Sequence, residues 1–242
     1  MQRSEVDCLK FCGTVPTNEP SARDLHSTIT RLTTELVRQG LVDDQEWPAL
    51  HHESGVEHVT TRFPVNSSVL KSVPYAVVYA EQARQRAFNF VFLDKAMIQM
   101  SYEIASGKLL RHRLAFLPSP SLIEFQTNPD LYLHETLYAD MVGYQVVSVP
   151  IRIDYDVRDG VPNGLQHPAA HLTLGQYQNC RIPVSAPVTP SVFVDFIVRH
   201  FYRAPGMKEA KIDLNLEQAF QNAQVLDLQG AVHLFSPGNR SA

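Results

Sequence analysis

Two aspartates separated by one residue, Asp154 and Asp156, are the first candidates for chemistry in this chain. They lie in the segment IRIDYD, where alternating apolar residues predict a β-strand. Side chains alternate between the two faces of a strand, so we expect Arg152, Asp154 and Asp156 on one face. Two carboxylates in this arrangement could share a divalent ion such as Mg²⁺ or Mn²⁺, or raise one another's pKa.

Two histidines follow these aspartates in the segment HPAAH. Pro168 disfavours helix at His167, so His167 and His171 do not form the helical metal clamp of an H-E-x-x-H motif. His171 starts the next predicted β segment and would lie beside the aspartates if the two strands pair. The hypothesis is a metal-assisted or acid–base site for phosphodiester cleavage. In it Asp154 and Asp156 bind the metal, His171 or His167 transfers the proton, and Arg152 or Arg181 holds phosphate.

The same residues have a simpler interpretation as a solvated surface. An exposed Arg–Asp pair on a strand is common and contributes little stability. The remaining positive residues form either a solvated face or a phosphate-contacting patch. These residues are Lys108, Arg111, His112, Arg113, Arg181, Arg199 and Arg203. Gln99 and Glu103, with Ser101 between them, could border the same site.

The elements that must position these residues are mainly β-strands. In residues 87–93, Phe alternates with Asn89, Val91 and Leu93, which predicts a strand buried largely on both faces. Asp94-Lys95 and Ser106-Gly107 are turn signals that bound predicted strands at 96–104 and 108–117. Links this short require antiparallel pairing and predict a meander. A further strand is predicted at 146–156, and a β segment or hairpin at 171–184.

Two amphipathic helices are predicted, one on each side of the strand-rich region. Ser21 is a good N-cap with Asp24 at the third helical position, and apolar residues recur at helical spacing up to Gly40. The second helix begins at Thr189 as N-cap, followed by Pro190. Its apolar stripe is expected in the core: Phe193, Phe196, Ile197 and Phe201.

These elements predict an α+β fold with a mainly antiparallel sheet, a meander, and helices packed on it. We expect one domain over residues 1–242, with an N-terminal helical segment at about 21–40. Residues 41–56 are expected to form a loop and residues 58–65 a short strand. Residues 75–79 fit a strand or a helix equally well. A short helix is predicted at 131–141, and an element or two of unassigned type at 212–235.

The composition is that of an ordinary globular protein. Hydrophobic residues make up 44% of the chain and charged residues 19%, which argues against a disordered, collagen-like or coiled-coil protein. The formal net charge of −4 disfavours a strongly basic nucleic-acid binder but is compatible with a local basic patch.

The compartment is predicted from the N-terminus and the cysteines. The N-terminus lacks the apolar segment of a signal peptide, and no run approaches about 18 apolar residues, so no membrane span is expected. Three scattered cysteines, Cys8, Cys12 and Cys180, fit a reducing cytoplasm. The chain lacks the motifs of P-loop, dinucleotide-binding and α/β-hydrolase proteins, so these activities have no motif support.

Several blocks spanning roughly residues 75–203 carry a family resemblance. They are FNFVFLDKAMIQMSYEI, RHRLAFLPSP, NPDLYL, VPIRIDYD, HPAAHLTLGQYQNCRIPV and PSVFVDFIVRHFY. These blocks resemble a bacterial family named domain of unknown function 2290, and the block beginning HPAAH is the most specific. Relative to the family pattern, Lys95 stands in place of a glycine and Ile153 in place of a phenylalanine.

Some members of that family resemble accessory proteins encoded beside a helicase in bacterial anti-phage loci. The resemblance therefore implies a defence role and a helicase partner, and it identifies no catalytic residue. Combined with the polar residues above, it leads to the hypothesis of a nuclease effector that acts on nucleic acid. The alternatives are a non-catalytic adaptor that regulates or recruits the helicase, and a toxin or antitoxin whose surface blocks a partner.

Overall fold

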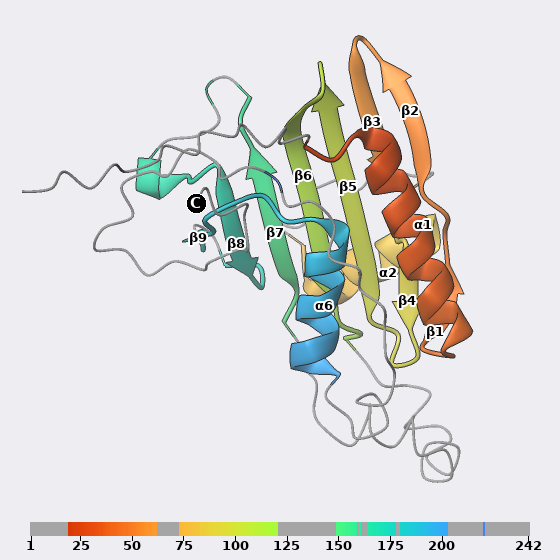
Figure 1. Ribbon diagram of the computed structural model, residues 1–242. Coiled ribbons are helices and arrows are strands. Elements are labelled where there is room, and N and C mark those ends of the chain that lie inside the picture. The colour runs from red at the N-terminus through yellow and green to blue at the C-terminus, as the bar shows by residue number, and fades with distance from the viewer. Residues whose placement is uncertain are drawn as a thin grey trace, which may run out of the picture.

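A single antiparallel sheet is the centre of the fold (Figure 1). The computed structural model describes residues 19–61, 73–120 and 149–202, except 159, 161–163 and 178–179, together with Phe220. Within these residues nine strands form one sheet, and three α-helices lie on its faces. The α+β class with a mainly antiparallel sheet is therefore confirmed.

The strands are β1 (Val42–Gln45), β2 (Ala49–Glu53), β3 (Val56–Thr60), β4 (Phe90–Phe92), β5 (Met97–Ala105), β6 (Lys108–Leu117), β7 (Ile151–Asp156), β8 (Ala170–Leu174) and β9 (Ile182–Pro183). Strand β5 lies in the middle. One of its edges pairs with β6, and the other edge pairs with β4 near its start and with β3 near its end. Strands β7, β8 and β9 follow β6 in order. The predicted meander is thus extended on both sides.

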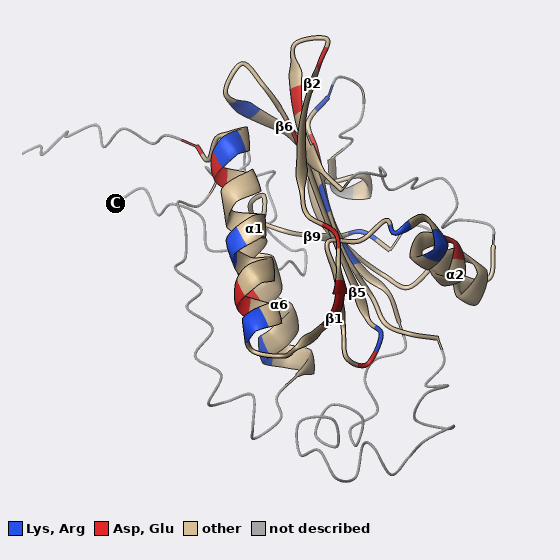
Figure 2. Cartoon of the chain, turned by 90° about the vertical axis from the view of Figure 1, so that its right-hand side faces the viewer, with Lys and Arg blue, Asp and Glu red and all other residues tan. Residues whose placement is uncertain are grey.

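Helix α1 (Ala22–Arg38) covers one face of the sheet (Figure 2). It begins with the predicted cap: Ser21 Oγ accepts a hydrogen bond from the Asp24 N–H, and the Asp24 carboxylate accepts one from the Ser21 N–H. This reciprocal pair satisfies two backbone donors that a helix start leaves open. The side chains that α1 turns toward the sheet are fully buried: Leu25, Ile29, Leu32 and Leu36.

Helix α6 (Pro190–Phe201) lies beside α1 on the same face of the sheet. Thr189 is its N-cap and accepts a hydrogen bond from the Val192 N–H at 3.4 Å, as the sequence predicts. Phe193 and Ile197 are fully buried in the main core, which the two helices form with the sheet. None of the described helices is both long and apolar enough to cross a membrane.

Helix α2 (Tyr75–Gln85) packs on the opposite face of the sheet (Figure 2). It settles the ambiguity of residues 75–79 in favour of a helix. A second, smaller apolar cluster lies beneath it, formed by Phe88, Val91, Met97, Ala115 and Leu117. Because this cluster occupies only one end of β5 and β6, the rest of that face is left to polar side chains.

Tight turns set the register of the strands that carry the polar face. Ser106 and Gly107 both adopt positive φ, 50° and 73°, as a two-residue type I′ hairpin requires. They join β5 to β6, and a β-bulge between Glu103 and Ile104 then shifts the pairing by one residue. As a result Ser101 lies directly opposite Arg113, and Glu103 opposite Arg111. The predicted turn between β4 and β5 is also present, with Lys95 at φ 66°.

Some of the expected element boundaries are wrong. Residues 41–56 were expected as a loop and instead contain β1 and β2. Strand β1 is short and polar and β2 is mostly exposed, so neither shows apolar alternation. Strand β3 ends at Thr60, β4 covers only Phe90–Phe92, and β7 starts at Ile151 rather than near 146. The helix predicted at 131–141 and the elements at 212–235, apart from Phe220, lie outside the described residues.

Candidate functional site: a charged face of the sheet

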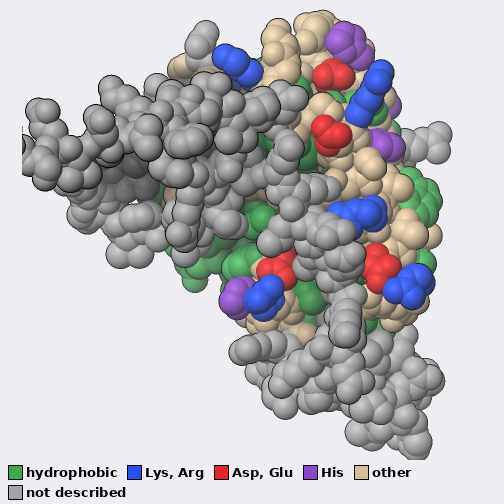
Figure 3. Space-filling model, viewed as in Figure 1, with side chains coloured by type: hydrophobic (Ala, Val, Ile, Leu, Met, Phe, Trp, Pro, Cys, Tyr) green, Lys and Arg blue, Asp and Glu red, His purple; other side chains and the backbone are tan. Residues whose placement is uncertain are grey.

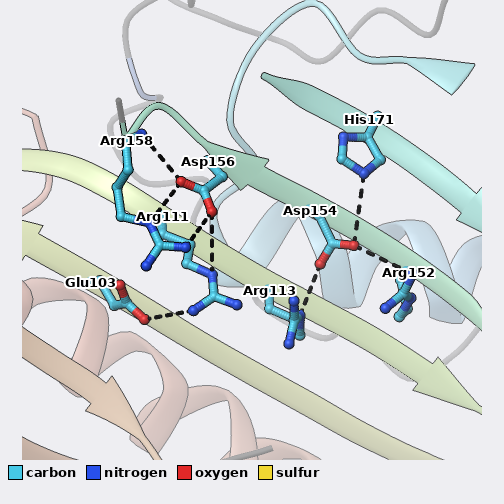
Figure 4. Close-up of polar contacts among 8 residues, drawn as sticks. All are labelled: Glu103, Arg111, Arg113, Arg152, Asp154, Asp156, Arg158 and His171. Carbon is cyan, nitrogen blue, oxygen red and sulfur yellow. Dashed lines mark hydrogen bonds and ion pairs between the residues drawn. The ribbon is translucent and has the colours of Figure 1, made fainter. Parts of the chain in front are cut away.

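Charged side chains from neighbouring strands gather on the face opposite α1 and α6, beyond the area covered by α2 (Figure 4). They come from β5, β6 and β7, with His171 from β8 and Arg158 just after β7. We call this group the charged face. It consists of Glu103, Arg111, Arg113, Arg152, Asp154, Asp156, Arg158 and His171.

Asp154 is the centre of one half of the charged face. Its Oδ1 accepts a hydrogen bond from Arg113 Nε at 3.1 Å, and its Oδ2 lies 3.7 Å from Arg152 Nη2. The side chains of Asp154 and Arg113 are each 13% exposed. Burial by itself raises the pKa of Asp154, but Arg152 and Arg113 outweigh burial and lower the pKa overall. The carboxylate is therefore ionised and held between two cations.

Asp156 forms a second, more exposed group on the same face. Arg158 donates two hydrogen bonds to it, from Nε at 2.9 Å and from Nη2 at 2.6 Å. Arg111 Nε lies 3.8 Å from the same carboxylate and also binds Glu103 through Nη1 at 3.0 Å. Burial raises the pKa of Asp156 and the Arg158 hydrogen bonds lower it, with a net decrease. Asp156 is therefore also engaged by arginines.

His171 lies directly opposite Asp154 in the β7–β8 register. Its Nδ1 is 2.9 Å from the Pro168 carbonyl oxygen, which can only accept, so Nδ1 carries the proton. Nε2 then faces Asp154 Oδ2 at 3.9 Å without a proton to donate. Burial lowers the pKa of His171, so the ring is neutral at pH 7.

The other residues of the predicted site differ in how they lie relative to Asp154 and His171. The His167 ring packs edge-on against His171, with 5.4 Å between ring centroids. Arg181 is partly exposed, and its Nη1 lies 3.5 Å from the Gln166 carbonyl oxygen. Asp156 shares the face but not the contacts of Asp154, since each carboxylate has its own arginines.

The charged face does not fit a divalent metal. A metal site needs several oxygen or nitrogen ligands that converge without competing cations. Asp154 and Asp156 each contact two guanidinium groups instead. In the parts of the chain that the structure describes, no group of three or more His, Cys, Asp or Glu side chains is placed to hold an ion. The donor set is that of an ion-pair network.

Three arginines that organise the face were not assigned this role from the sequence: Arg111, Arg113 and Arg158. Arg111 and Arg113 alternate with His112 in β6, a signal for one polar face, but their pairing with β7 depends on strand order. His112 points to the core face instead, where its Nε2 accepts a hydrogen bond from the Val188 N–H at 3.0 Å. Gln99 does not border the face, because α2 covers it and Gln82 accepts its hydrogen bond.

On the other side of the sheet, the described side chains show a different arrangement of charge. Basic and acidic side chains lie next to one another there without forming one patch (Figure 3). Two of the pairs are Arg38–Glu35 on α1 and Arg199–Asp195 on α6, each within one helix. These two pairs lie within single helices, whereas the ion pairs of the charged face join neighbouring strands.

Comparison with known proteins gives one match. The family described as "Uncharacterized conserved protein (DUF2290)" matches residues 41–235, most of the chain. No curated protein matches, and no solved structure matches. The match includes every strand of the sheet together with α2 and α6, and it begins after α1.

Proposed function

The chain belongs to the DUF2290 family, and we propose that it is a non-catalytic adaptor that works with a helicase in bacterial defence against phage. The helicase and the defence role are proposed from the resemblance of the sequence blocks described above. A helicase partner would place the protein in the cytoplasm. The adaptor role is proposed from the chemistry of the charged face.

The observation that carries the adaptor role is the pairing of both aspartates with arginines. A metal-assisted nuclease needs carboxylates that are free to hold the metal ion near the scissile phosphate. Here two arginines engage each carboxylate. Fixed charges of alternating sign on a rigid sheet are instead suited to partner selection, because complementary charges favour one partner and repel others.

Charge reversal tests the adaptor role. Arg158 is 46% exposed and reaches solvent from the edge of the charged face. We expect Arg158→Glu to weaken co-purification with the helicase encoded beside the gene at least tenfold and to abolish phage protection. Arg199→Glu is the matched control, because Arg199 is an exposed arginine paired with an aspartate on α6, on the other side of the sheet. Equal effects of both variants would contradict the proposal.

A nuclease assay tests whether the protein is non-catalytic, as the adaptor role requires. We expect the purified protein to leave plasmid DNA and RNA intact, with and without Mg²⁺ or Mn²⁺, alone and with the helicase. Metal-dependent cleavage that disappears in Asp154→Asn would replace the adaptor by the metal-assisted nuclease.

One observation favours a second candidate, a metal-independent nuclease. His171 is neutral, and the ring of His167 lies beside it, which is the pairing that acid–base cleavage of a phosphodiester uses. This candidate predicts cleavage in the presence of EDTA that His171→Asn abolishes. The same EDTA control therefore separates the two nuclease mechanisms from each other and from the adaptor.

A further inference from the structure

Two arginines of the charged face have hydrogen-bonding capacity that the described residues do not use. Arg113 donates one hydrogen bond, from Nε, although a guanidinium has five N–H groups. Arg152 has one ion pair in the described part of the chain, and its 3.7 Å length exceeds that of a hydrogen bond. Their side chains are only 13% and 15% exposed. Shielded guanidinium donors without acceptors are unfavourable unless a ligand supplies acceptors.

Two hydroxyl groups stand beside these arginines. Ser101 lies directly opposite Arg113 in the β5–β6 register, and Thr173 lies directly opposite Arg152 in the β7–β8 register. Thr173 is only 6% exposed. The four side chains therefore come from four adjacent strands, and the two arginines among them contact the Asp154 carboxylate. A set so rich in donors matches a ligand with several acceptor oxygens.

The charge of the set selects the kind of ligand. Arg113 and Arg152 carry two positive charges and Asp154 one negative charge, which leaves one positive charge. The whole chain, by contrast, has a formal net charge of −4. The net charge of +1 is neutralised by an anion with a single negative charge. An anion with two negative charges would be repelled more strongly by Asp154. Arginine forks bind phosphate oxygens in pairs, which gives geometric selectivity as well as attraction.

From this juxtaposition we propose that Arg113, Arg152, Ser101 and Thr173 form a binding site for a phosphodiester group of a nucleic-acid strand. Asp154 holds the two guanidinium groups in place and sets the net charge of the site. The site requires no metal and no bond cleavage. It goes beyond the adaptor role, because it is a property of the isolated protein and does not depend on the helicase.

Fluorescence anisotropy with a labelled single-stranded 20-nucleotide DNA, at low salt, tests the site. We expect the wild-type protein to bind and Arg152→Gln to weaken binding at least tenfold. The slope of log affinity against log salt should fall by about 0.7 in this variant, the value for one lost contact to a single strand. The matched control is Arg84→Gln on α2, on the same side of the sheet, where Arg84 is exposed and paired with Glu81. It should change affinity less than twofold.

Competition identifies the source of the phosphate. An unlabelled strand should displace the probe, while ATP and inorganic phosphate, which carry more charge per phosphate, should displace it poorly. If ATP displaced the probe as well as the unlabelled strand does at the same concentration, the proposal would be overturned in favour of a nucleotide site. An acidic peptide that displaced the strand equally well would overturn it in favour of a protein partner.

Two further variants keep the test decisive if Arg152→Gln does not fold. Arg152→Lys keeps the charge but loses the fork, and Thr173→Val removes the hydroxyl while keeping the shape; each should weaken binding severalfold. Absence of binding by the wild-type protein, or equal losses in Arg152→Gln and Arg84→Gln, would contradict the site. Neither result would bear on co-purification with the helicase, so failure of this proposal and failure of the adaptor role are distinguishable.

Discussion

At the scale of single residues, Asp154 and Asp156 lie on the same face of one strand and each contacts two arginines, but their partners differ in exposure. Asp154→Asn leaves the shielded Arg113 and Arg152 without a counter-charge, so we expect it to lower the free energy of unfolding by about 3 kcal/mol. Asp156→Asn should cost about 1 kcal/mol or less, because its partner Arg158 is half exposed and solvent replaces the interaction. Urea unfolding of both variants measures the difference, and equal losses would show that burial does not distinguish them.

His112 gives a pH dependence with a defined sign. Burial is the main cause that lowers its pKa to about 3 from the ordinary 6.5. Its Nε2 accepts the Val188 N–H, and its Nδ1 is buried without a partner in the described part of the chain. Below pH 6.5 the unfolded chain takes up a proton at this position and the folded chain does not, so stability falls as the pH drops toward 3.

The loss expected for His112 is about 2 kcal/mol between pH 7 and pH 5, a window above the titration of most carboxylates. Urea unfolding as a function of pH measures it. His171 adds a decrease of the same sign, because burial lowers its pKa too. His112→Gln keeps an acceptor for the Val188 N–H and should make the pH dependence shallower; an unchanged slope would assign the effect elsewhere.

The alternation of residues in IRIDYD was sufficient to predict that Arg152, Asp154 and Asp156 share a face. It could not predict how exposed these side chains are, and their exposure decides whether they form a surface ion pair or a shielded network. Arg113 reaches Asp154 from a strand 41 residues earlier in the chain. Such a partner depends on which strands are neighbours, and alternation within one strand contains no information about neighbours.

At the scale of elements, the turn between β4 and β5 contains a strained residue. Lys95 has φ 66°, in the left-handed region that costs a residue with a side chain about 1 kcal/mol or more. Glycine adopts this conformation freely. Lys95→Gly also removes an ion pair with Asp43 at 2.9 Å, which is partly exposed and worth little.

We therefore expect Lys95→Gly to raise the free energy of unfolding by about 0.5–1 kcal/mol. Lys95→Ala is the control, since it removes the ion pair and keeps the strain, and it should lower stability slightly. Thermal unfolding of the three proteins measures both. A glycine variant no more stable than the alanine variant would show that the turn is not strained.

The helices show where sequence reasoning at this scale succeeds. Local caps and helical spacing predicted α1 and α6, because both signals lie within the element itself. Within α6, Phe193 and Ile197 are in the core as predicted, whereas Phe196 and Phe201 pack at its edge and are only partly buried. A stripe of apolar residues defines the inner side of a helix, but the width of the covering sheet determines how much of the stripe is enclosed.

At the scale of the whole molecule, the family match and the core do not begin at the same residue. The match starts at residue 41, after α1. Helix α1 nevertheless contributes five fully buried residues to the main core, four of them Leu or Ile, so the fold needs it. We expect a chain that starts at residue 41 to lack a cooperative unfolding transition.

A pair of point variants checks this without truncation. Leu32→Asp places a charge in the core and should unfold the protein, while Thr34→Asp, on the exposed side of the same helix, should change the melting temperature by only a few degrees. Circular dichroism on heating measures both. Cooperative melting of Leu32→Asp at the wild-type temperature would show that α1 is dispensable.

The class of the fold could be predicted from the sequence, and its strand order could not. Turn signals identified the β5–β6 hairpin, since the turn and its strands are adjacent in the chain. Strands β1 and β3 join β4 and β5 from a distant part of the sequence. Strand β1 is too short and too polar to show a pattern, and the pattern that predicted a strand near β3 does not indicate which strand it pairs with. The charged face depends on the pairing of β7 with β6 and with β8, which turn signals within one hairpin do not predict.

The two-residue turn at Ser106-Gly107 also bears on how fast the protein folds. It brings β5 and β6 together by closing almost no loop, whereas the pairing of β7 with β6 closes a loop of tens of residues, as in the Arg113–Asp154 contact. The hairpin should therefore form before the transition state for folding, and the charged face after it. Loss of the Asp154 carboxylate would then accelerate unfolding in a stopped-flow experiment and leave the refolding rate nearly unchanged. The charged face would thus govern how long the native state persists and have little influence on how quickly it is reached.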